Sequence, residues 1–187
     1  MKDVFVSGWC GFEELFGSFA DRFELIVPFR DEVNFEKLSG RNLVCWSTGA
    51  NLALKAGNLN FDNIILVSPF IRFTDYTPER VLKLMIKKFR AVPDAVIKDF
   101  LTACGCPEID LPKMLDYQAL GKGLEYLLDS GEGIQLQRPE MTVIHGADDA
   151  VVNAASGRAV AERSGAKFVS VKCGHFVPPE IISEYLI

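Results

Sequence analysis

The sequence predicts an α/β protein with one mostly parallel sheet of about six strands and helices on both of its faces. Six short segments are apolar throughout, which is typical of strands that are covered on both sides. Helix-forming segments separate most of them, and this alternation favours parallel pairing. The alternation is interrupted once, between Pro69 and Pro139, where about seventy residues carry no strand signal and predict a helical insertion.

The predicted elements of the sheet region follow in order along the chain. Pro28 ends the second strand, and Ser68-Pro69 closes the fourth. The strands are expected at residues 4–6, 23–27, 43–46, 64–67, 141–144 and 167–171. Helices are expected at residues 12–20, 48–57, 154–164 and 179–187. The polar segment 29–40 is expected to form a loop with one helical turn.

The insertion divides the chain into two regions. Residues 1–70 and 139–187 are expected to form the sheet region, and residues 71–138 a helical lid, because insertions of this length are commonly functional. Pro78 and Pro93 open two of the predicted helices, at a position where a missing backbone N–H is harmless. Three lid helices are expected, at residues 78–91, 93–104 and 112–129, the last interrupted at Gly121-Lys122-Gly123.

Composition narrows the class of protein. The chain has 187 residues, of which 49% are hydrophobic, so it can form one globular domain with a proper core. We expect a cytoplasmic monomer without a membrane segment, because no apolar run approaches about 20 residues and residues 1–6 do not resemble a signal peptide. The net charge of −5 argues against general nucleic-acid binding. Five cysteines suit a reducing compartment, and Cys104-Gly105-Cys106 lacks the second Cys/His pair of a zinc site.

Ser47 lies where a predicted strand passes directly into a predicted helix, with small residues at the crossing. A serine at such a place is most often a helix N-cap. It is also the position of a nucleophile on a sharp strand-to-helix turn, where the next N–H and the helix N-terminus point at the same spot. The usual pattern of that turn is G-x-S-x-G. Here Cys45 replaces the first glycine and Gly49 is the second.

A serine hydroxyl needs a base to take its proton and an acid to orient that base. The chain has two histidines, His145 at the end of the fifth predicted strand and His175 just after the sixth. The order serine, acid, histidine selects Ser47, then Asp148 or Asp149, then His175. His145 is a rival base, but it comes one strand too early, and we expect its ring to bond to backbone near the acid loop.

Two backbone N–H groups are expected to bind the oxyanion that forms during attack on an ester. One belongs to Thr48, which follows the nucleophile. The other is expected from Trp9, in the loop after the first strand, where Gly8 allows a turn. The Trp9 ring would also supply an apolar wall, although an aromatic residue at a strand end is equally common in a core.

Several motifs together resemble the α/β-hydrolases, and more narrowly the pimeloyl-[acyl-carrier protein] methyl ester esterases of biotin synthesis. These motifs are Ser7-Gly8-Trp9-Cys10-Gly11, Cys45-Trp46-Ser47-Thr48-Gly49, His145-Gly146 with Asp149 and Val152, Gly174-His175, and the segment 120–127. The resemblance implies a minimal α/β-hydrolase fold with a helical lid, a carboxylesterase activity and no cofactor or metal. The family spacing after Gly146 selects Asp149 over Asp148 as the acid. The chain begins at the family's third strand, which leaves six strands, and Ser7 stands where the family has histidine.

The resemblance also implies an acidic acyl carrier protein as partner. Between Arg72 and Lys98 the sequence has seven basic and three acidic residues, so the charge of this stretch is opposite to that of the chain. A solvated helix face would explain it equally well. The expected docking residues are Arg72, Arg80, Lys83, Lys87, Lys88 and Arg90.

Residues expected to line the acyl site are Trp9, Phe70, Phe73, Met85 and Phe89, although core packing explains these apolar side chains as well. The functional prediction is hydrolysis of the methyl ester of pimeloyl-acyl carrier protein. Two alternatives stay open at this point. One is a general carboxylesterase for small acyl esters, and the other is a non-catalytic binding protein with the same fold.

Overall fold

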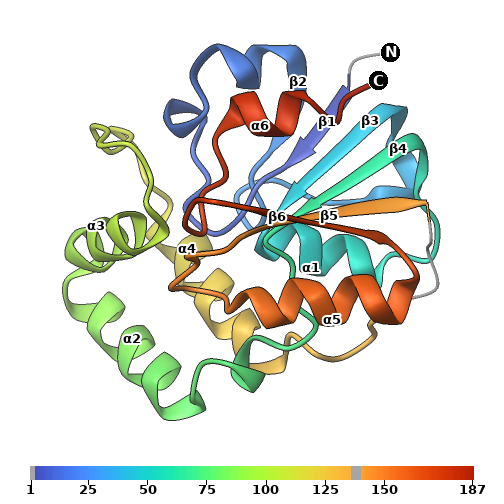
Figure 1. Cartoon of the computed structure of the whole chain (residues 1–187). Coiled ribbons are helices and arrows are strands. Elements are labelled where there is room, and N and C mark those ends of the chain that lie inside the picture. Colours follow the sequence, from blue (N-terminus) through green and yellow to red (C-terminus); the bar gives the residue numbers. More distant parts are fainter. Residues whose placement is uncertain (1–2, 136–139) are drawn as a thin grey trace.

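The computed structural model describes residues 3–135 and 140–187, and a six-stranded sheet lies at the centre of this part of the chain (Figure 1). The strand order is β2-β1-β3-β4-β5-β6, and every neighbouring pair is parallel. The strands are β1 (Asp3–Val6), β2 (Phe23–Ile26), β3 (Ser39–Trp46), β4 (Asn60–Val67), β5 (Met141–Gly146) and β6 (Lys167–Val171). The prediction of a six-stranded parallel sheet is therefore confirmed.

The apolar side chains of the central strands alternate between two cores, one on each face of the sheet. Val44 and Ile65 pack in the first core, and Leu43, Cys45 and Leu66 pack in the second. All of these side chains are completely buried. Because each strand is covered on both sides, its sequence is apolar throughout rather than alternating, which is why the strands could be recognised.

Helices cover both faces of the sheet, as predicted. On one face lie α1 (Thr48–Lys55) and α5 (Ala154–Ser164), whose buried side chains join the second core (Figure 1). On the other face lies α6 (Pro179–Ser183), with the segment 12–22 beside it. The predicted helix 179–187 thus ends earlier than expected, at Ser183. In the predicted loop 29–40, one 3₁₀ turn forms at Phe35–Lys37.

The prediction of an amphipathic helix over residues 12–20 is wrong. Two short 3₁₀ helices, Glu13–Leu15 and Gly17–Arg22, occupy this segment. Gly17 has a φ of +51°, which an α-helix cannot contain, so the helix is divided there. The apolar residues still face the core, where the Phe16 ring lies 4.7 Å from the Phe5 ring. Side chains three residues apart share a face in both helix types, and the spacing could not distinguish them.

Three helices occupy the insertion between β4 and β5: α2 (Glu79–Ala91), α3 (Pro93–Cys104) and α4 (Tyr117–Tyr126). They lie together at one end of the molecule, away from the two chain termini (Figure 1). The expected interruption at 121–123 is absent, because α4 runs through both glycines. Gly123 is needed for packing: a Cβ there would lie 2.7 Å from Cδ1 of Trp9. The expected boundary at residue 139 lies outside the described residues.

Two side chains of the sheet region hold the insertion in place. Asn51 of α1 is completely buried, and its Nδ2 donates to the carbonyls of Phe70 at 2.9 Å and Ile71 at 3.0 Å, where the insertion begins. The same amide group donates to the Ser130 carbonyl and accepts from the Tyr126 hydroxyl, near the end of the insertion. Trp9 Nε1 donates to the Leu120 carbonyl of α4 at 2.8 Å. Within the described residues, no helix is long and apolar enough to cross a membrane.

Replacing Asn51 by alanine is expected to lower the free energy of unfolding by about 3 kcal/mol, because buried carbonyl groups at both ends of the insertion lose their donor. Tyr126→Phe, which removes only the hydroxyl bond to Asn51, is expected to cost about 1 kcal/mol and serves as the matched comparison. Urea unfolding followed by circular dichroism measures both. Equal stabilities of the two variants would contradict the bridging role of Asn51.

Candidate active site

Ser47 occupies a sharp turn between β3 and α1. Its φ is +53° and its ψ is −112°, a strained conformation for a residue with a side chain. Backbone hydrogen bonds hold it on both sides: Ser47 N–H donates to the Val67 carbonyl at 2.8 Å, and Asn51 N–H donates to the Ser47 carbonyl at 3.0 Å. Gly49 lets α1 approach β1, since a Cβ on Gly49 would lie 2.3 Å from the Val6 carbonyl oxygen.

Cys45 is compatible with this turn even though it replaces a glycine of the usual pattern. Its side chain is completely buried in the core beneath α1 and α5, together with Ala50, Ala53 and Leu66. Burial raises the pKa of the Cys45 thiol, so the group behaves there as a small neutral side chain. The departure from the glycine pattern is thus accommodated by core packing.

The structure brings Ser47, His175 and Asp149 together. His175 is completely buried; its Nε2 lies 2.8 Å from Ser47 Oγ and its Nδ1 lies 2.7 Å from Asp149 Oδ2. Since a carboxylate can only accept, Nδ1 carries the proton and Nε2 is the acceptor for the serine hydroxyl. Ser47 follows β3, Asp149 follows β5 and His175 follows β6. The carboxyl ends of these strands meet at one edge of the parallel sheet.

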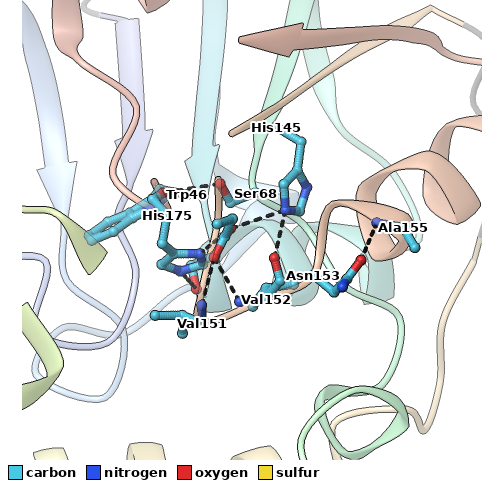
Figure 2. A network of polar contacts seen from close by, with 10 residues as sticks. Trp46, Ser68, His145, Val151, Val152, Asn153, Ala155 and His175 are labelled. Carbon is cyan, nitrogen blue, oxygen red and sulfur yellow. Dashed lines mark hydrogen bonds and ion pairs between the residues drawn. The ribbon is translucent and has the colours of Figure 1, made fainter. Parts of the chain in front are cut away.

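The backbone of His175 is fixed by two further hydrogen bonds. Its carbonyl accepts from Trp46 Nε1 and from Ser68 Oγ, both at 3.0 Å. Figure 2 shows Trp46 and Ser68 beside His175, with dashed lines for these contacts. Trp46 ends β3 and Ser68 follows β4, so the loop that carries the imidazole is attached directly to the ends of two central strands.

Asp149 accepts hydrogen bonds on both carboxylate oxygens. Oδ1 accepts from the backbone N–H groups of Val151 and Val152, each at 2.8 Å, and Oδ2 accepts from His175. Burial by itself would raise the pKa of this carboxyl, but the hydrogen bonds from His145, His175 and the backbone hold it well below its usual range. Asp148 is exposed. The structure therefore places Asp149, and not Asp148, next to the imidazole.

His145 lies behind the acid rather than beside the nucleophile. Its Nε2 is 2.9 Å from the Val152 carbonyl, which is the kind of backbone contact expected from the sequence. The same nitrogen lies 3.1 Å from Asp149 Oδ2, a contact that the sequence did not predict. Only the fold could reveal it, because the contact depends on how the loop after β5 turns back on the strand.

The expected oxyanion donors lie close to the nucleophile. The loop after β1 passes over Ser47, since a Cβ on Gly8 would be 3.0 Å from Ser47 Cβ. Trp9, Ser47 and Thr48 line the same cavity. Among the described residues, no acceptor is recorded for the backbone N–H of Trp9 or of Thr48. Both groups are available to a ligand at this point, as an oxyanion site requires.

A cavity of about 490 Å³ extends from Ser47 between the sheet region and the lid helices. Trp9, Phe73 and Met85 line it, as expected. Phe70 and Phe89 do not line it, and those two predictions are wrong: Phe70 is completely buried with its ring 5.5 Å from the Phe73 ring, and the Phe89 ring lies 5.9 Å from the Trp9 ring. Lining residues that the sequence analysis missed are Thr77, Val81, Leu82, Leu84, Lys88, Val96, Asp99, Phe100, Ala103, Leu124, Leu127, Ala150 and Val151.

The missed residues of α2 carry a signal in the sequence. Val81, Leu84 and Lys88 lie at helical spacing with Met85, which the sequence did predict, so all four share one face. The sequence could not show that this face turns toward Ser47, because that depends on the packing of α2 against α3. In residues 3–135 and 140–187, no group of histidine, cysteine and acidic side chains could hold a metal ion.

The basic residues expected to dock a carrier are all exposed, with Arg72 ahead of α2 and the other five on it. Three of them form ion pairs: Lys83 with Glu79 at 2.6 Å, Lys88 with Asp99 at 2.7 Å, and Arg90 with Glu125 at 2.8 Å. Arg80 and Lys87 form no ion pair with any described residue. These two are therefore the α2 cations most available to a partner.

Comparison with known proteins identifies the fold. No family profile matches the chain, and no curated protein matches it either. Among solved structures, it is similar to BioG from Haemophilus influenzae, with 12% identity, a TM-score of 0.59, and coverage of 94% of this chain and 88% of that chain. The esterase EaEST from Exiguobacterium antarcticum shares 16% identity with a TM-score of 0.61, covering 94% of this chain and 85% of its own.

An α/β-hydrolase fold protein from Burkholderia ambifaria shares 16% identity with a TM-score of 0.62, and the match covers 96% of this chain and 87% of that one. At these identities the likeness shows the fold alone. The chain has the α/β-hydrolase fold, as its motifs indicated.

Asp149→Asn is expected to destabilise the protein in a pH-dependent way. Because the folded state lowers the pKa of this carboxyl, its contribution is present above the unfolded pKa of about 3.9 and is lost as the pH falls below it. The stability difference between the original chain and Asp149→Asn should thus narrow from about pH 5 to about pH 3.5. Urea unfolding at both pH values measures it. Asp148→Asn is the matched control and should leave stability unchanged; a pH-independent difference for Asp149→Asn would refute the prediction.

Proposed function

We propose that the protein is a serine carboxylesterase that hydrolyses the methyl ester of pimeloyl-acyl carrier protein. One observation carries the catalytic part of this proposal: the hydrogen-bonded series Ser47–His175–Asp149 opens directly into an apolar cavity. A serine bonded to the free nitrogen of an imidazole, which is itself bonded to a buried carboxylate, is the arrangement that activates a hydroxyl for acyl transfer.

In the first half of the reaction, Ser47 Oγ attacks the ester carbonyl while His175 Nε2 takes the hydroxyl proton. The carbonyl oxygen becomes an oxyanion and is bound by the N–H groups of Trp9 and Thr48. The imidazolium is held by Asp149. The bond to the methoxy group then breaks, and His175 returns the proton to the leaving oxygen, which departs as methanol. The acyl group remains as an ester on Ser47.

In the second half, a water molecule attacks this acyl-enzyme, and His175 Nε2 again takes the proton. The same two N–H groups bind the second oxyanion. The bond to Ser47 Oγ breaks, the proton passes from His175 to the serine, and the carboxylic acid leaves. The residues return to their starting states, and the described residues supply every group that the cycle needs apart from water and the ester.

The cavity and the lid support the choice of substrate. The cavity walls from α2, α3 and α4 are largely apolar, which suits an acyl chain. Helix α2 carries five basic residues and one acidic residue in a chain of net charge −5, which would favour an acidic carrier. The sequence motifs resemble those of esterases acting on this substrate, and the similar structures include BioG and an esterase.

One feature favours a second candidate, a general carboxylesterase for small acyl esters. Over the whole insertion, residues 71–138, ten basic residues are balanced by ten acidic ones, so the net positive charge of α2 is offset by net negative charge in the rest of the insertion. Three of its cations are already paired with acidic side chains. Exposed pairs of this kind contribute little to stability, but they reduce the field available to steer a carrier.

Replacing Ser47 by alanine is expected to lower ester hydrolysis at least a thousandfold, because the nucleophile is removed while the cavity is kept. The measurement is mass spectrometry of the carrier-bound product, together with labelling by a fluorophosphonate probe. The original chain should remove the methyl group from the substrate, and the probe should label it at Ser47. Equal rates for both proteins would exclude the mechanism, and an unlabelled Ser47 would favour the non-catalytic binding protein.

The charge-reversal pair Arg80→Glu and Lys87→Glu is expected to raise KM for the carrier-bound ester about tenfold at low salt and to leave kcat unchanged. The matched control is Lys37→Glu with Arg41→Glu, an equal charge change at exposed positions near the other end of β3. Hydrolysis of a p-nitrophenyl ester should be the same in all three proteins. If both pairs change KM for the carrier substrate equally, the general esterase is the better assignment.

A further inference from the structure

His145 contacts the acid of the triad from the side away from the nucleophile. It lies near the end of β5 and is completely buried. Its Nε2 is within hydrogen-bond distance of two oxygens, the Val152 carbonyl at 2.9 Å and Asp149 Oδ2 at 3.1 Å. Figure 2 shows the two histidine rings on either side of the loop that carries Val151 and Val152. Asp149 Oδ2 is therefore shared by two imidazoles.

The surroundings of His145 define its tautomer. Both oxygens at Nε2 are acceptors, so this nitrogen must carry a proton. Nδ1 has no hydrogen-bond partner among the described residues, and it is packed against α5: a Cβ on Gly157 would lie 2.2 Å from it. A proton on Nδ1 would be buried without an acceptor, which is costly. The ring is thus the neutral Nε2–H form, a donor to the carboxylate.

This extra donor completes the coordination of the carboxylate. Oδ1 accepts from the N–H groups of Val151 and Val152, and Oδ2 accepts from His145 and His175. The four donors fix the plane of the carboxylate and so the direction from which His175 Nδ1 is held. A donor on Oδ2 also withdraws electron density from the atom that attracts the His175 proton, which makes the carboxylate a weaker partner for the imidazolium.

The other titratable groups around Asp149 do not donate hydrogen bonds to its carboxylate. The Cys104 thiol of α3 and the Cys173 thiol after β6 interact with its charge, but burial raises the pKa of both, so they face the carboxylate as neutral groups. Asp148 is exposed to solvent. His145 is accordingly the one group beyond His175 whose side chain donates to the carboxylate in the described part of the chain.

We propose that His145 is a positioning residue of the esterase reaction, holding the Asp149 carboxylate in place and setting how strongly it attracts the proton on His175. This inference rests on the proposed function. His145 does not reach Ser47 and gives up no proton, because its Nε2–H stays on two fixed acceptors and its Nδ1 is closed off by Gly157. It acts through Asp149 alone.

The test compares His145→Phe, which keeps a ring but removes the donor, with His145→Gln, whose side-chain amide can place an N–H near the same position. Hydrolysis of p-nitrophenyl butyrate is measured across pH. For His145→Phe, kcat should fall about tenfold or more with little change in KM. The acid limb of the pH–rate profile should move to higher pH, because the freed carboxylate binds the His175 proton more strongly. His145→Gln should restore both toward the original chain.

The outcomes separate this inference from the proposed function. If the original chain hydrolyses the ester no faster than Ser47→Ala, the esterase assignment fails and this role fails with it. If the original chain is active and His145→Phe has the same kcat and the same acid limb, the assignment stands and the role of His145 is refuted. A loss of kcat in His145→Phe without a pH shift, unrescued by His145→Gln, would mean a merely structural residue.

A second measurement covers the case in which His145→Phe does not fold. Nitrogen-15 NMR of the original chain at about pH 8 reports which nitrogen of each neutral imidazole carries the proton. The inference requires Nε2–H for His145 and Nδ1–H for His175. An Nδ1–H tautomer at His145 would overturn it, because that ring could not donate to Asp149.

Discussion

The buried Asp149 carboxylate is the interaction on which the site depends. It joins the loop after β5 to the loop after β6, and through His175 it reaches Ser47 at the end of β3. A buried charge of this kind is stable only when every oxygen has donors, and here two backbone amides and two imidazoles supply them. The short loop after β5 therefore has little freedom: its backbone must place two N–H groups on one oxygen while leaving the other open to the rings.

The position of Ser47 depends on a second constraint, the close packing of β3, α1 and β1 where they cross. Ser47 can hold its positive φ because the chain on either side is fixed, by the Val67 carbonyl before it and by the Asn51 N–H after it. Gly49 and Gly8 leave room for the Val6 carbonyl and for Ser47 itself. Asn51 then uses its side chain to hold both ends of the insertion. The same turn of helix thus positions the serine and attaches the lid. A substitution that displaces the lid attachment is therefore expected to displace Ser47 as well.

Much of the site could be predicted from the sequence, because its residues lie at the ends of apolar strands and their order along the chain is fixed by the parallel sheet. Strand-end positions and their order point to Ser47, His175 and one of Asp148 and Asp149, and also to the contact of His145 with backbone. The choice of Asp149 depends on the spacing of the family that the motifs resemble. The predictions that failed have two causes: a local backbone requirement in one case, and contacts between distant segments in the other. The segment 12–20 has apolar spacing that suits either helix type, and Gly17 decided between them. Phe70, at the end of the sheet region, and Phe89 of the lid are apolar like Phe73 and Met85, and nothing local shows which of the four face the cavity.

The cavity has two different walls: one lies beside Ser47, and the other is formed by α2 and α3. Trp9 belongs to the first wall: it lines the cavity together with Ser47, its indole N–H donates to the Leu120 carbonyl of α4, and its ring packs against Gly123. A change on this wall moves the catalytic groups as well. The second wall comes from α2 and α3, where Val81 and Leu84 are substantially exposed and the exposed pair Lys88–Asp99 joins the helices. Side chains there can change without disturbing Ser47, since exposed pairs contribute little to stability. Substitutions on α2 and α3 are therefore expected to change the shape of the cavity, while Ser47, His175 and Asp149 keep their places at the edge of the sheet.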